Sequence, residues 1–134
     1  MNRNGRTVSR LIGVLALAFA ADVFAQKLSG NEVRIGVVVP VTGQAADVGK
    51  REAIGAQAAA DVINARGGVG GVPIKLYFAD EGTNPQEAIG AVRKVAGDDK
   101  VLAIVGPHYS GTAEATFPLG NRMKIVQVAV ASSK

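Results

Sequence analysis

Apolar and polar positions form blocks along this chain, and the blocks have the lengths of strands and helices. Four short apolar runs rich in β-branched residues are bounded by glycine, proline or polar residues, which predicts buried strands. Three longer stretches between them carry apolar residues at helical spacing. The predicted strands cover residues 33–40, 72–80, 101–106 and 124–130.

The first interval, residues 50–68, predicts a helix that ends at the Gly67–Gly68 pair. Alanine, which has the highest helix propensity, is frequent in this interval, and glycine commonly stands just beyond a helix C-terminus. Apolar residues at near-helical spacing define one face of this helix: Ile54, Ala58, Val62 and Ala65.

The other two intervals predict one well-defined helix and one weaker helix. The second helix can begin with Pro85 at its first position. Its buried face is predicted to hold Ala88, Ile89, Val92 and Val95. The third helix follows Tyr109, and we expect Pro118 and Gly120 to interrupt it.

The alternation of strand and helix predicts an α/β fold with an open parallel sheet and helices on both faces. We expect the first strand to be central, with the second strand on one side and the third on the other. Ligands of such sheets bind beyond the carboxyl ends of the strands, where strand order reverses. The predicted crevice therefore lies between the loops that follow strands one and three.

The N-terminus has the pattern of a secretory signal. Residues 1–10 are basic, residues 11–21 are apolar, and Val23 and Ala25 are small residues before a predicted cleavage site. An uncleaved N-terminal anchor is the alternative. We therefore expect residues 1–25 to be a signal peptide, and residues 26–134 to be an exported, periplasmic mature chain that is one partial lobe.

Composition excludes several classes of function. The net charge of +4 falls to +2 without residues 1–25, with twelve basic against ten acidic residues. No basic stripe with interleaved aromatic residues remains, which disfavours nucleic acid as a partner. The chain has no cysteine and a single histidine, His108. We therefore expect no disulfide, no metal site and no cofactor.

The predicted crevice loops contain glycine and small polar residues, and they suit binding better than catalysis. His108 and Ser110 share one loop, but no acid accompanies them there, and nucleophilic catalysis needs a base and a group that orients it. We expect His108 to be a solvated or capping residue. The sequence therefore predicts no catalytic residue and no enzyme.

The stretch VGPHYSGTAEA suits a small anion. A helix that begins after Tyr109 offers unpaired backbone N–H groups at its first turn, and its dipole favours negative charge there. The hydroxyls of Ser110 and Thr112 add donors. Ser110 as an ordinary helix N-cap is an equally good interpretation, and the two are compatible.

Five motifs together resemble one family. They are TG at residues 42–43, ADVINARGG at 60–68, DEGTNPQEAI at 80–89, VGPHYSG at 105–111 and VASS at 130–133. In this order they resemble the N-terminal lobe of periplasmic leucine/isoleucine/valine-binding proteins, which have the type I periplasmic binding fold. This family feeds ABC transporters and has relatives that bind amides, urea and aromatic acids.

The resemblance implies a binding site. Ser110 corresponds to the residue that contacts the α-carboxylate of the ligand, and Ala131 and Ser133 correspond to a ligand-binding pair after the fourth strand. Val48 stands where the family often has an aromatic residue. With Tyr109 and Thr112 from the loop itself, the predicted ligand-binding residues are Tyr109, Ser110, Thr112, Ala131, Ser133 and Val48.

The resemblance also implies partners and a missing part. A small amino acid or related carboxylate is the expected ligand, and the permease of an ABC transporter is the expected protein partner. The family's second lobe supplies the acid for the ligand ammonium, so we expect a truncated copy that binds amino acids weakly or undetectably. The alternatives are an exported α/β hydrolase and a signalling or redox domain of receiver or flavodoxin type.

Overall fold

The computed structural model describes residues 31–130 and contains a four-stranded parallel sheet. The strand order is β2-β1-β3-β4, so the first strand is central with its two successors on opposite sides, as predicted. Register pairs Val33 with Ile74 and Ile35 with Ala103. The strands are β1 (Val33–Val39), β2 (Ile74–Asp80), β3 (Ala103–Val105) and β4 (Val126–Val128).

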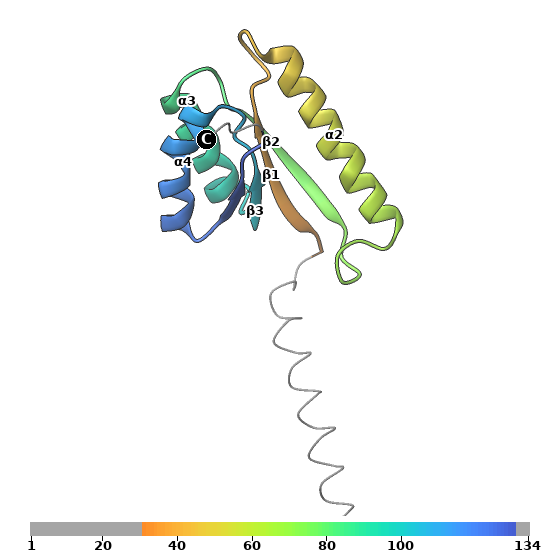
Figure 1. Cartoon of the computed structure of the whole chain (residues 1–134). Helices are drawn as coiled ribbons and strands as arrows, with labels where there is room; N and C mark the ends of the chain where they lie inside the picture. Colours follow the sequence, from red (N-terminus) through yellow and green to blue (C-terminus); the bar gives the residue numbers. More distant parts are fainter. Residues whose placement is uncertain (1–30, 131–134) are drawn as a thin grey trace, which may run out of the picture. The chain divides into compact units, whose positions relative to one another are not determined.

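The helices cover both faces of the sheet, which confirms the predicted α/β class (Figure 1). Helix α2 (Ala46–Ala65) lies on one face, which we call the front face. Helices α3 (Pro85–Arg93) and α4 (Ser110–Met123) lie on the opposite face, which we call the back face. A π-helical turn, η2 (Lys94–Asp98), continues α3 toward β3.

The main core lies on the back face, between the sheet and α3 and α4. Asn84 caps α3 by accepting a hydrogen bond from the Glu87 amide, and Pro85 occupies the first turn, as predicted. Ala88 and Val92 of α3 and Val95 of η2 are fully buried, which confirms the predicted face of this helix. The remaining buried members of this core are Val38, Ala91, Val101, Ile104 and Leu119.

The predicted face of α2 is wrong. Ile54 and Val62 are exposed, and the side chains that face the sheet are instead Ala56, Ala60 and Ile63, of which only Ala60 is buried. Two contacts set this rotation. At one end, a Cβ added to Gly49 would lie 1.8 Å from the carbonyl oxygen of Pro40, and at the other end the Asn64 side chain bonds both backbone groups of Ile74. Alanine on nearly every side of the helix hides this rotation from a hydrophobicity pattern.

Helix α4 is continuous, so the predicted interruption at Pro118 and Gly120 is also wrong. Pro118 lies on the exposed side of the helix, where the carbonyl that loses its partner can be hydrated. Gly120 is buried because the helix approaches β4 closely there. A Cβ at Gly120 would lie 2.6 Å from Nε2 of Gln127.

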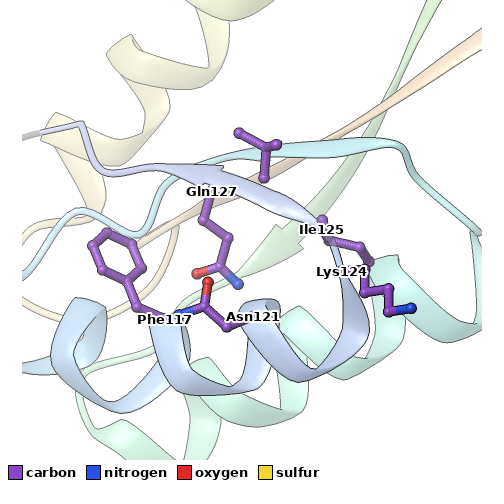
Figure 2. Close-up of a pocket in the computed structure, with 6 residues that line it drawn as sticks. Phe117, Asn121, Lys124, Ile125 and Gln127 are labelled. Atoms are coloured by element: carbon purple, nitrogen blue, oxygen red, sulfur yellow. The ribbon is translucent and has the colours of Figure 1, made fainter.

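The side of the sheet at β4 is less covered than the rest. On the front face, Val126 and Val128 are 65% and 59% exposed. On the back face, a cavity of about 370 Å³ lies between the C-terminal half of α4 and β4, and Figure 2 shows Phe117, Asn121 and Gln127 beside it. We call these two valines, together with the lining of this cavity, the β4 flank. The lining residues are Phe117, Asn121, Lys124, Ile125, Val126 and Gln127.

Candidate ligand-binding edge of the sheet

The loops that follow the strands meet at the carboxyl edge of the sheet. Because β1 pairs with both β2 and β3, the loops at residues 40–45, 81–84 and 106–109 are neighbours there. The sequence predicts this edge as the position of the site.

The loop after β1 is fastened to the end of β2 by Asp80. This carboxylate accepts hydrogen bonds from the Val41 amide at 2.9 Å, the Thr42 hydroxyl at 2.5 Å and the Gly82 amide at 3.0 Å. Burial by itself raises the pKa of Asp80, but the hydrogen bonds from Thr42, Gly82 and Val41 outweigh it and lower the pKa below its ordinary value. Asp80 is therefore held as the charged anchor of this loop.

Helix α2 begins directly after this loop, and Val48 lies in its first turn. Val48 is half-buried. The close approach of Gly49 to the Pro40 carbonyl brings this first turn against the end of β1. Val48 thus lies at the predicted edge of the sheet.

The loop after β3 begins with a tight backbone contact. Gly106 has φ +115°, and a Cβ there would lie 1.9 Å from the carbonyl oxygen of Val38. Only glycine fits such a conformation at this distance. The Gly106 amide donates to the Val128 carbonyl at 2.8 Å, and the Val130 amide donates to the Pro107 carbonyl at 3.1 Å. These bonds hold this loop beside the chain that leaves β4.

The carboxylate of Glu81 lies inside the loop that follows β3 and is 0% exposed. Its Oε2 accepts the His108 amide at 2.6 Å, and its Oε1 accepts the Tyr109 amide at 3.0 Å. The Thr112 hydroxyl also donates to Oε1. The stretch that the sequence analysis identifies as suited to an anion therefore surrounds an anion that belongs to the protein.

This arrangement changes the roles expected of the loop residues. Thr112 is buried, and its single hydroxyl proton is shared between the Glu81 carboxylate and the Tyr109 carbonyl, so this side chain has its partners inside the protein. Tyr109 is the N-cap residue of α4 and makes no side-chain cap. Its amide hydrogen bond goes to Glu81, so it too is used within the chain.

Ser110 is the first residue of α4, so its alternative interpretation as the helix N-cap is wrong. It is half-buried at the carboxyl edge, and Gly111 beside it is exposed, with open space where a Cβ would lie. The predicted residues Ala131 and Ser133 lie outside the described part of the chain. The structure thus gathers Val48, Tyr109, Ser110 and Thr112 at this edge of the sheet.

His108 is paired rather than solvated, contrary to the expectation from sequence. Its Nδ1 lies 2.7 Å from Oε1 of Glu52, which comes from α2, and both side chains are mostly buried. The loop after β3 contains no acidic residue, and the acid that pairs with His108 is Glu52, 56 residues earlier in the sequence. This pair connects the first turns of α2 to the loop after β3 on the front face of the sheet.

Sequence reasoning missed Glu52 and Glu81 for different reasons. Glu52 lies in the middle of a helical stretch, and nothing in the local pattern marks it. Asp80 and Glu81, however, are two acidic residues directly after a buried strand, at the edge where the loops meet. That position was a usable signal for carboxylates that bind loop amides.

The described residues hold no other obvious centre of chemistry. Among residues 31–130, no group of three or more metal-ligating side chains is placed to hold a metal ion. Within the same range, no helix has both the length and the hydropathy to cross a membrane.

Comparison with known families gives a match over most of the chain. A family model described as periplasmic binding protein matches residues 32–134. The Leu/Ile/Val-binding protein BraC3 of Rhizobium johnstonii is 38% identical over 100 residues, which are 75% of this chain and 25% of that protein. The Leu/Ile/Val-binding protein of Escherichia coli K12 is 32% identical over 98 residues, 73% of this chain and 25% of that protein.

Solved structures agree with these relatives. The branched-chain amino acid transporter substrate-binding protein LivJ of Streptococcus pneumoniae, in complex with isoleucine, has a TM-score of 0.73 and 29% identity over 77% of this chain and 30% of that chain. A solute-binding protein of Rhodopseudomonas palustris, in complex with 3,4-dihydroxybenzoic acid, has a TM-score of 0.69 and 25% identity over 78% of this chain and 28% of that chain.

This chain therefore spans between a quarter and a third of the length of the relatives it matches. The matched family consists of binding proteins and not of enzymes, which agrees with the absence of a predicted catalytic residue. From the family match over residues 32–134 and the identity to Leu/Ile/Val-binding proteins, the chain belongs to the periplasmic binding protein family.

Proposed function

We propose that this chain carries the carboxylate-binding part of the solute-binding component of an ABC uptake transporter. Its ligand would be a branched-chain amino acid or a related small carboxylate. The observation that carries this proposal is that α4 starts at the carboxyl edge, directly after the loop that follows β3.

The ligands named for the matched structures share one group. Isoleucine and 3,4-dihydroxybenzoic acid differ in size, shape and charge, but both have a carboxylate. The edge of the sheet at the start of α4 belongs to the part of the fold that matches in these proteins, so it suits the carboxylate that their ligands have in common. The rest of each ligand would be bound by other residues. We therefore propose a class of ligand and not a single ligand.

The first turn of α4 has the chemistry for this group. Helix N-termini present backbone N–H groups and a partial positive charge. The Gly111 side of this turn is exposed and lacks a Cβ that would obstruct a ligand. We assign the carboxylate contact to the Ser110 hydroxyl and the amides of Gly111 and Thr112, with Val48 on the facing wall. Ala131 and Ser133 remain proposed contacts from the chain after β4.

A titration followed by ¹H–¹⁵N NMR tests this assignment. Leucine and isoamylamine have the same branched side chain, and only leucine has a carboxylate. We expect leucine to shift the Gly111 and Thr112 amides and isoamylamine to leave them unchanged. Equal shifts with both compounds, or no shift with leucine, would contradict the proposal.

Export and a permease partner belong to the same proposal. The basic and apolar blocks of residues 1–21 support a signal peptide that is cleaved before Gln26 and a periplasmic mature chain. Mass spectrometry of the periplasmic fraction of a Gram-negative expression host tests this, and a chain that retains residues 1–25 would contradict it.

A further inference from the structure

We propose that Glu81 is a positioning residue for ligand binding and the built-in counter-anion of the α4 N-terminus. It would fix the loop after β3 in its binding conformation and select single carboxylates over anions with two charges. The ligand part of this inference rests on the proposed function, whereas the positioning part can be tested without any ligand.

Glu81 occupies the loop after β3 as a bound anion would, with its carboxylate surrounded by hydrogen-bond donors. Its carboxylate is 0% exposed and accepts two backbone amides and one hydroxyl, all from residues 108–112. A buried charge is costly unless donors compensate it, and hydrogen bonds to a charged acceptor are stronger than neutral ones. Here one loop supplies all three donors, so the carboxylate and the loop stabilise each other.

The geometry explains why this contact positions the start of α4. A carboxylate is a rigid planar group, and its two oxygens bind consecutive amides, those of His108 and Tyr109. Thr112, one turn further along, binds the same oxygen as Tyr109. Together these bonds fix the peptide planes that lead into the helix, and hence the direction in which the Gly111 amide points.

Glu81 also sets the charge at this helix end. A helix N-terminus is ordinarily suited to phosphate as well as carboxylate. The buried negative charge of Glu81 offsets part of that attraction and repels a second negative charge strongly in a poorly hydrated site. A zwitterionic amino acid has no net charge and is least affected. The expected ligand class is therefore a small monocarboxylate and not a phosphate or sulfate.

Hydrogen exchange of the ligand-free chain tests the positioning role. In Glu81→Gln, which keeps the size of the side chain, the His108 and Tyr109 amides should exchange about tenfold faster or more, as expected for loss of a bond to a charged acceptor. Asp80→Asn is the matched control, because it changes the charge of the neighbouring residue and should leave exchange at these two amides unchanged relative to exchange at the Val38 amide. The Val38 amide reports any general loss of stability.

A second variant covers the case in which Glu81→Gln does not fold. Thr112→Val removes one donor to Glu81 with little change in volume, and it should accelerate exchange at Tyr109 more than at Val38. If exchange at His108 and Tyr109 is unchanged, or rises only in parallel with Val38, Glu81 does not position this loop.

Inorganic phosphate tests the charge selection. In the native chain we expect leucine, but not equimolar phosphate, to shift the Gly111 amide. In Glu81→Gln the ratio of the phosphate shift to the leucine shift should rise about tenfold, because the repelling charge is gone; a purely structural role would lower both shifts together and leave the ratio unchanged. Equal responses to phosphate and leucine in the native chain would overturn the selectivity. No response to leucine would overturn the proposed function, and hydrogen exchange would still decide the positioning role.

Discussion

The carboxyl edge of the sheet and the β4 flank differ in how many hydrogen bonds hold them and in how well they are covered. At the edge, Asp80 and Glu81 together accept five hydrogen bonds from the loop after β1, the loop after β3 and the first turn of α4, and Asp80 accepts a sixth from the Gly82 amide. At the flank, Val126 and Val128 are exposed on the front face. Within the described residues, each region has one buried side-chain oxygen without a hydrogen-bond partner: Oε2 of Glu52 at the edge and Oε1 of Gln127 at the flank.

The side-chain anchors of the proposed binding edge come from the end of β2, and two backbone bonds also join the loop after β3 to Val128 and Val130. Parallel sheets are normally covered on both faces, and the exposed valines show that this covering is incomplete around β4 in residues 31–130. Substitutions in the two regions should therefore have very different effects on stability.

The largest effect is expected at Gly106. In Gly106→Ala, the positive φ costs about 1–3 kcal/mol, and the contact with the Val38 carbonyl adds a similar overpacking cost. Gly111→Ala is the control in the same loop region, where a Cβ meets open space in a helix, and it should be neutral or slightly stabilising. Urea unfolding followed by circular dichroism measures both, and similar stabilities for the two variants would contradict the account of the loop.

The second largest effect on stability is expected on β3, and the neighbouring strand β4 serves as its control. Ile104 on β3 is 1% exposed and lies in the back-face core, so Ile104→Ala should cost about 2–5 kcal/mol. Val126→Ala, on the adjacent strand β4, should change the free energy of unfolding by less than about 0.5 kcal/mol. A large loss of stability in Val126→Ala would show that the β4 flank is covered in solution, for example by a second copy of the chain.

The smallest effect concerns Asp80 and depends on pH. The pKa of Asp80 in the folded chain lies below its unfolded value of about 3.9, so its charged form stabilises the fold above that value. The contribution is lost as the pH falls through the lower, folded-state pKa. We expect Asp80→Asn to cost about 1 kcal/mol at pH 7 and progressively less below pH 4. Unfolding measured at several pH values checks this, and a cost that does not change with pH would contradict it.

The fold could be predicted because its strands and its second helix have strong patterns. Ala88, Val92 and Val95 recur at helical spacing against polar neighbours, and the structure buries all three. Helix α2 has no such contrast, since alanine lies on several of its faces. Its orientation comes from Gly49 and Asn64, whose contacts with Pro40 and Ile74 become visible only in three dimensions.

The gathering of the candidate residues at one edge of the sheet could be predicted, but the hydrogen bonds among them could not. Parallel topology brings Val48 and residues 109–112 to one edge, and this follows from the order of strands alone. The partners of Thr112 and His108 are Glu81 and Glu52, which are 31 and 56 residues away in sequence. Local spacing carries no information about such contacts. The sequence therefore predicts that the donors of this loop can bind a ligand, whereas in the structure several of them bind Glu81.

The central claim is that a ligand carboxylate binds at the start of α4 and not in the cavity of the β4 flank. A crystal structure of this chain soaked with isoleucine at high concentration tests it most directly. We predict that the isoleucine carboxylate lies at hydrogen-bonding distance, about 3 Å, from the Gly111 or Thr112 amide. Isoleucine bound beside Phe117 and Asn121, with the α4 N-terminus unoccupied, would contradict the account.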